Sequence, residues 1–97
     1  MVRTANNNCR QYVESLTEFK GSNLFSESKP KYYVVYSYGY HFPILLYVRA
    51  DAIWFINKDK YSRSTTDHQS QTYPHYGKKV NTDKAELQKI INLLNRE

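Results

Sequence analysis

The pattern of hydrophobic and polar positions begins with a helix and a loop. From Thr4 to Phe19, apolar residues recur at steps of three and four, which is typical of a helix with one buried face. Gly21 is placed to end this helix. The polar segment GSNLFSESKP, residues 21–30, predicts a loop in which Leu24 and Phe25 turn back against the core.

The middle of the chain predicts a strand that is buried on both faces. The segment YYVVYSYGY, residues 32–40, is rich in β-branched and aromatic residues, and its first half carries apolar side chains at odd and even positions alike. We therefore expect a central strand. Its buried positions should be Val34, Val35 and Tyr36, whereas Tyr38 and Tyr40, next to the following turn, should be exposed.

Two further strands are predicted after the first one. The segments ILLYVR (44–49) and AIWFIN (52–57) are apolar and are separated by a plausible tight turn at Ala50 and Asp51. Trp54 in the second segment is expected to anchor the core. Because the links between the three strands are too short for parallel crossovers, the strands should form an antiparallel meander.

The end of the chain predicts a second helix. Thr82 or Asp83 can cap its N-terminus, and Asp83 with Glu86 approximates a capping box. The apolar positions that follow have helical spacing: Leu87, Ile90, Ile91 and Leu94. The expected architecture is one α+β domain, residues 1–97, in which a three-stranded antiparallel sheet packs against N- and C-terminal helices in the order α-β-β-β-α.

Composition narrows the class of protein. A length of 97 residues fits one domain, and the single cysteine, Cys9, permits no internal disulfide. Cys9 falls on the apolar stripe of the first helix, where we expect a buried thiol without catalytic function. No apolar run is long enough for a membrane span, and the N-terminus lacks the apolar core of a signal peptide. The sequence predicts a cytoplasmic protein that does not bind membranes.

Charge is concentrated towards the end of the chain. The net charge is +5, and residues 56–84 hold six basic residues against three acidic ones, a local charge of +3. A basic surface favours a polyanionic partner such as DNA or RNA.

Within this basic region, residues 61–76 (YSRSTTDHQSQTYPHY) form a neutral, hydrogen-bonding stretch. Hydroxyl, amide and basic groups can contact phosphate oxygens and base edges, and tyrosines can stack on bases. Tyrosine and arginine also anchor protein interfaces. The expected binding residues share these chemistries: Lys60, Tyr61, Arg63, Thr65, Thr66, His68, Gln69, Gln71, Tyr73, His75, Tyr76, Lys78 and Lys79.

Catalysis is the alternative for the same stretch. His68, His75 and Asp67 do not have a recognised metal-ligand spacing, and adjacent Asp67 and His68 side chains tend to diverge rather than form a triad with serine. We therefore expect no metal, no cofactor and no catalytic residues. The runner-up is a metal-free ribonuclease. His68, His75 or a tyrosine would transfer protons, and the developing phosphorane charge would be stabilised by Arg63, Lys60 and Lys78.

Three segments carry a resemblance. EFKGSNLF (18–25), YVVYSYGYHFP (33–43) and KYSRSTTDHQSQ (60–71) resemble a family of small, uncharacterised proteins encoded by phages and mobile elements. The most specific part is the tyrosine-rich strand followed by a Y-S-x-[ST]-T-[ST]-x-H-x-S-Q stretch. This chain departs from the pattern at Ser26 and Asp67. The family implies no established enzymatic activity.

The resemblance implies a biological setting. Small proteins from phage accessory regions frequently bind and block host machinery, including CRISPR effectors. The resulting hypothesis is a non-enzymatic inhibitor of a nucleic-acid-handling defence complex, acting in the host cytoplasm. Its partner would be a defence protein or ribonucleoprotein effector, with direct contact to DNA or RNA as a further option. A virion-associated oligomeric structural protein is the third alternative.

Overall fold

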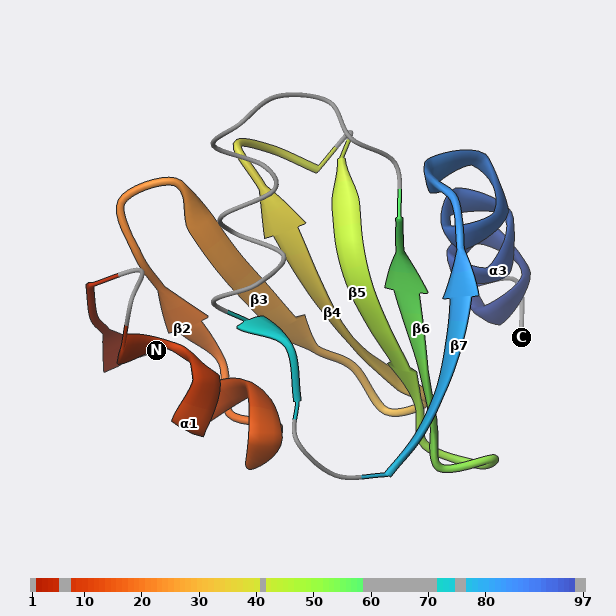
Figure 1. Cartoon of the computed structure of the whole chain (residues 1–97), viewed down its shortest axis with the longest axis horizontal. Helices are drawn as coiled ribbons and strands as arrows, with labels where there is room; N and C mark the ends of the chain where they lie inside the picture. Colours follow the sequence, from red (N-terminus) through yellow and green to blue (C-terminus); the bar gives the residue numbers. More distant parts are fainter. Residues whose placement is uncertain (1, 6–7, 41, 59–71, 75–76, 96–97) are drawn as a thin grey trace.

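The computed structural model describes residues 2–5, 8–40, 42–58, 72–74 and 77–95 (Figure 1). Its strands are β1 (Val2–Arg3), β2 (Phe19–Lys20), β3 (Leu24–Ser28), β4 (Tyr32–Ser37), β5 (Pro43–Val48), β6 (Ile53–Asn57) and β7 (Lys78–Thr82). Two helices lie wholly within these described residues, α1 (Arg10–Glu14) and α3 (Lys84–Asn95). The strands form one sheet in which the spatial order equals the order along the chain.

The fold is α+β, but the predicted three-stranded antiparallel sheet is wrong. The sheet has seven strands and is mixed, because β1 pairs with β2 and β6 pairs with β7 in parallel. The predicted meander is its centre: β4 pairs antiparallel with β5, and β5 with β6. The parallel pair at the end is possible because the chain between β6 and β7 is long enough for a crossover connection.

Part of the extra sheet comes from the segment predicted as a loop. Residues 24–28 form β3, which pairs with β4 from Leu24 opposite Ser37 to Ser28 opposite Tyr33. Leu24 is buried and Phe25 is half-buried, as the sequence predicted. The polar residues around them concealed the strand, since its backbone pairing depends on the neighbouring strand more than on its own composition.

The predicted N-terminal helix is much shorter than Thr4–Phe19. It covers Arg10–Glu14 and ends because Leu16 adopts a left-handed conformation, with a φ of 56°. The Thr17 N–H donates to the Tyr12 carbonyl at 2.8 Å and the Leu16 N–H to the Val13 carbonyl at 3.0 Å, which are the two bonds of a Schellman motif. The chain then turns into β2, so Phe19 reaches the core from a strand.

Helices α1 and α3 cover opposite faces of the sheet. Cys9 and Val13 from the α1 region pack in one cluster with Tyr33, Val35 and Trp54. Successive residues of a strand point to opposite faces. Correspondingly, the other cluster joins Leu87 and Ile91 of α3 to the other side of β4, at Tyr32, Val34 and Tyr36, and to β5 at Leu46 and Val48. Figure 1 shows α1 beside β2 and α3 beside β7.

Most of the burial predicted for single residues is confirmed. Val34, Val35 and Tyr36 are buried, and all six residues of β4 are inaccessible, as expected of a central strand. Tyr38 and Tyr40 at the turn are 52% and 63% exposed. Trp54 and Cys9 are fully buried.

The predicted C-terminal helix is also confirmed. The Asp83 carboxylate accepts a hydrogen bond from the Glu86 backbone N–H at 2.8 Å, as a capping residue does. Leu87 and Ile91 are buried, whereas Ile90 and Leu94 are half-buried at the edge of the same cluster.

Candidate functional site

Few of the predicted binding residues belong to the described part of the chain. Tyr73, Lys78 and Lys79 do. The others lie outside the described residues: Lys60, Tyr61, Arg63, Thr65, Thr66, His68, Gln69, Gln71, His75 and Tyr76. The predictions made for that group, including catalysis by His68 or His75, stay predictions.

Two lysines converge on one tyrosine ring. The Nζ atoms of Lys58 and Lys79 lie 5.6 Å and 5.3 Å from the centroid of the Tyr73 ring, within the range of a cation–π interaction. Lys58 directly follows β6, Lys79 belongs to β7, and Tyr73 belongs to the connection between these strands. The parallel pairing of β6 and β7 thus brings together three side chains that are distant in sequence.

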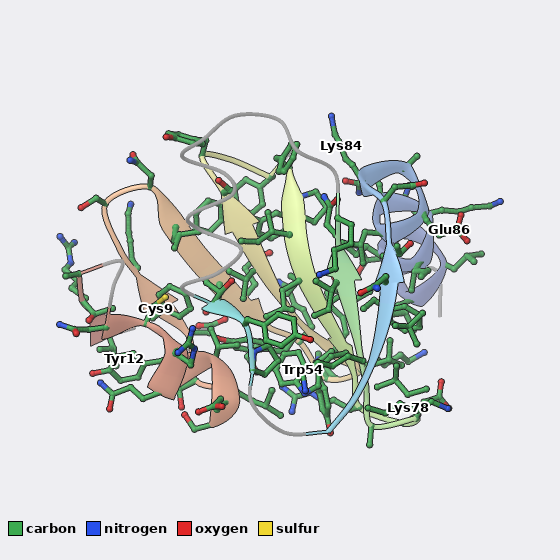
Figure 2. All side chains as sticks on the ribbon, viewed as in Figure 1. Cys9, Tyr12, Trp54, Lys78, Lys84 and Glu86 are labelled. Atoms are coloured by element: carbon green, nitrogen blue, oxygen red, sulfur yellow. The ribbon has the colours of Figure 1, made fainter. Side chains whose placement is uncertain are left out.

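The register of β7 separates the two adjacent lysines that the sequence grouped together. Lys79 pairs with Trp54 of β6 and therefore points to the face on which Trp54 is buried. Lys78 pairs with Ile53 and points to the opposite face, because side chains alternate along a strand. In Figure 2, Lys78 lies at the outer edge of the molecule, away from Trp54. Lys79 joins Tyr73, and Lys78 does not.

Tyr73, which the two lysines flank, packs against the hydrophobic core. Tyr73 is half-buried and contacts the cluster that contains Trp54. The Tyr47 and Trp54 rings lie 4.7 Å apart beneath this surface, on paired positions of β5 and β6. Lys79 Nζ also donates to the Gly77 carbonyl at 3.4 Å. These contacts restrict the freedom of the side chains before any partner binds.

A third lysine extends the cationic surface towards α3. The Lys84 ammonium lies 5.6 Å from the centroid of the Phe42 ring, which is itself buried, so this position presents the exposed lysine and not the ring to a partner. The Lys58 N–H donates to the Thr82 carbonyl at 2.8 Å, which holds the end of β6 beside the start of α3. We call Lys58, Tyr73, Lys79, Lys84 and Phe42 the basic–aromatic strip.

Sequence reasoning had not selected Lys58, Lys84 or Phe42 as site residues. The available signal was the basic charge of residues 56–84, which includes both lysines, but charge alone does not say which aromatic ring each one covers. That assignment requires the strand pairing.

The thiol of Cys9 is unsuited to nucleophilic chemistry at neutral pH. Burial raises its pKa from the ordinary value of 9.0 to about 11, which outweighs the opposing effects of the local backbone and of Arg10. The side chain is fully buried in the core. The predicted burial of this thiol is confirmed.

In the described part of the chain, no group of three or more His, Cys, Asp or Glu residues is arranged to hold a metal ion. The helices of this part of the chain are too short or too polar to cross a membrane.

Comparison with known proteins finds no matching family model, no matching curated protein and no similar solved structure. The resemblance carried by residues 18–25, 33–43 and 60–71 therefore stays a prediction.

Proposed function

We propose that this chain is a non-enzymatic binding protein that contacts a polyanionic macromolecule, DNA or RNA, through the basic–aromatic strip. The observation that carries the proposal is the position of the Lys58 and Lys79 ammonium groups around the Tyr73 ring. Lysine neutralises phosphate, and a tyrosine ring offers a stacking surface to a base. Binding of this kind needs no catalytic geometry.

The setting that we propose is inhibition of a host defence complex, as in anti-CRISPR proteins. A basic strip on a small protein can occupy the nucleic acid that such a complex must bind, or the nucleic acid within a ribonucleoprotein effector. The local charge of +3 supports this direct mode over imitation of DNA, which requires an acidic surface.

The test compares two adjacent lysines that point to opposite faces. Binding of fluorescein-labelled twelve-nucleotide RNA and DNA would be measured by anisotropy between 50 and 200 mM salt. Lys79→Gln and Lys58→Gln should each weaken binding roughly threefold or more, and each should reduce the slope of log affinity against log salt by about 0.7–0.9. Lys78→Gln removes the same charge from the other face and should change affinity less than Lys79→Gln.

The control also separates binding from stability. Lys58 and Lys78 are exposed, so their substitution should leave the Tm nearly unchanged. Equal losses from Lys78→Gln and Lys79→Gln would show only a nonspecific effect of net charge and would contradict the proposal. Absence of measurable binding to either nucleic acid at 50 mM salt would also contradict it.

A further inference from the structure

A groove with an apolar floor lies at the C-terminal end of α3. It consists of two adjoining cavities, of about 240 and 470 Å³, which share the lining residues Pro30, Lys31 and Leu94. The walls come from the turn between β3 and β4, the turn between β5 and β6, and the last turn of α3. The larger cavity falls within the range of about 300–1,000 Å³ that is usual for binding pockets.

Apolar groups make up much of the lining of this groove. Val48, Ala50, Leu94 and Pro30 line the larger cavity, and Tyr32 and Leu94 line the smaller one. Val48 is buried and Leu94 is half-buried at the edge of the α3 cluster. The groove therefore opens on the α3 face of the sheet, whereas Lys79 and Tyr73 belong to the other face.

The charged residues that line the groove are all basic. They are Lys29 and Lys31 in the first turn and Arg49 in the second. Three described carboxylates lie nearby without lining either cavity: Glu27, whose Oε2 is 3.9 Å from Lys29 Nζ, Glu18, whose Oε2 accepts from the Ser28 N–H at 2.7 Å, and Asp51, which follows Ala50. The lining thus combines cations with apolar surface.

The groove is pre-organised by hydrogen bonds between its walls. Arg49 donates from Nε to the Lys29 carbonyl at 3.0 Å and from a terminal nitrogen to Ser28 Oγ at 2.6 Å, which ties the two turns together. The Tyr32 hydroxyl donates to Asn95 Oδ1 at 2.8 Å and ties β4 to the end of α3. Walls that are fixed before binding lower the entropic cost of binding.

We propose that this groove binds an acidic segment of a partner protein, with one apolar side chain of that segment in the cavity and its carboxylates at Lys29, Lys31 and Arg49. Charge complementarity argues for an acidic occupant. Nucleic acid fits less well, because the one aromatic residue that lines the groove, Tyr32, is only 4% exposed and offers little surface for base stacking. This surface goes beyond the proposed function and is independent of it.

The experiment uses the full chain and methyl NMR. The probe is a blocked dodecapeptide that carries one leucine flanked by aspartates and glutamates. The control peptides replace the leucine by serine or the acidic residues by lysines. The acidic peptide should shift the methyl signals of Val48, Ala50 and Leu94, and both control peptides should bind at least tenfold more weakly.

Variants of the protein complete the test. The double substitution Lys29→Glu with Lys31→Glu should weaken binding of the acidic peptide at least tenfold, while Lys89→Glu with Lys20→Glu, which makes the same charge change at exposed positions outside the groove, should change it less than threefold. A melting curve of each variant checks that the fold is retained. The basic–aromatic strip is unaltered in both variants, so nucleic-acid binding tests the proposed function separately.

The proposal would be overturned by the absence of methyl shifts at millimolar peptide, by equal losses in the two double variants, or by shifts confined to residues around Lys58 and Lys79. Shifts of Val48 and Leu94 that depend on protein concentration in the absence of peptide would instead assign the groove to a second copy of this chain, and would overturn it as well.

Discussion

The backbone of Gly77 lies against the indole ring of Trp54. A Cβ atom on Gly77 would be 3.2 Å from both Cδ1 and Nε1 of this buried ring, and Gly77 has a φ of 84°. Two independent reasons, a left-handed backbone and a close approach, therefore require glycine where the chain enters β7.

Gly77→Ala is expected to lower the free energy of unfolding by about 1–2 kcal/mol, because a side chain in the left-handed region is strained and Trp54 must move. Urea unfolding would measure the change. The control is Gly21→Ala, since Gly21 does not have a positive φ. A loss for Gly77→Ala no greater than that for Gly21→Ala would contradict this account.

A substitution at Ala52 should raise the free energy of unfolding, in contrast to Gly77→Ala. Ala52 is exposed in the turn between β5 and β6 and has a φ of 54°. Ala52→Gly should raise the free energy of unfolding by roughly 0.5–1 kcal/mol, because the relief of strain exceeds the added entropy of the unfolded chain. Ala50→Gly, at an exposed position of the same turn without a positive φ, should lower it. The free energy of unfolding of both variants would be measured by thermal or urea unfolding. If Ala52→Gly and Ala50→Gly change it in the same direction, the explanation is refuted.

The cap of α3 gives a third prediction. The Asp83 carboxylate accepts the Glu86 N–H at 2.8 Å. Asp83→Ala should destabilise the fold by about 1 kcal/mol, whereas Asp83→Asn keeps an acceptor oxygen and should cost only a few tenths of that. Far-UV circular dichroism during urea unfolding would compare the two. Equal destabilisation by alanine and asparagine would show that the cap is not the cause.

The raised pKa of the Cys9 thiol should make the stability of the fold depend on pH. Because burial raises this pKa from 9.0 to about 11, the unfolded chain loses the Cys9 proton at a lower pH than the folded chain does. The contribution of Cys9 to stability is therefore complete below pH 9 and declines as the pH rises from 9 to 11. The free energy of unfolding, measured by urea at each pH, should fall more steeply between pH 9 and 11 for the natural chain than for Cys9→Ala. That variant retains all the other titrating groups. Parallel slopes would contradict the assignment.

Alkylation offers a second measurement on the same residue. At pH 8.5, the native chain should react with iodoacetamide roughly a hundredfold more slowly than the chain in urea, since a pKa difference of two units lowers the thiolate fraction by about that factor. Mass spectrometry would follow the alkylation. Equal rates for the native chain and for the chain in urea would show that the thiol is accessible and ionised in the folded protein.

Local patterns predicted those elements whose cause is local. The stripe from Leu87 to Leu94 and the cap at Asp83 are contained within one stretch of chain, and α3 forms as predicted. The apolar and aromatic residues at both odd and even positions of residues 32–36 are an equally local pattern, so the burial of both faces of β4 could be predicted.

The helical spacing near the N-terminus predicted a helix that is too long, and the reason is physical. Cys9, Val13 and Phe19 all reach one core cluster, so their periodicity does report a shared buried surface. Leu16 nevertheless leaves the helix in a left-handed conformation, and Phe19 enters the same cluster from β2. Periodicity identified the buried side chains but not the backbone that presents them.

The candidate sites were less predictable than the core. Lys78 and Lys79 are neighbours in sequence, but alternation along β7 sends them to opposite faces, and only the register with Ile53 and Trp54 says which lysine meets Tyr73. The groove at the end of α3 had no sequence signal, because its lining comes from two turns and a helix end, each ordinary by itself.

The amino-acid order by itself determined which side chains leave water, where the last helix starts, and that positive charge gathers between residues 56 and 84, since these follow from side-chain chemistry and short-range spacing. Tertiary structure alone decided the seven-stranded sheet, the parallel pairs at its two edges and the surfaces assembled across it. Strand pairing joins residues far apart along the chain, and its hydrogen bonds are made by backbone groups that nearly every residue carries, so no local pattern could specify it.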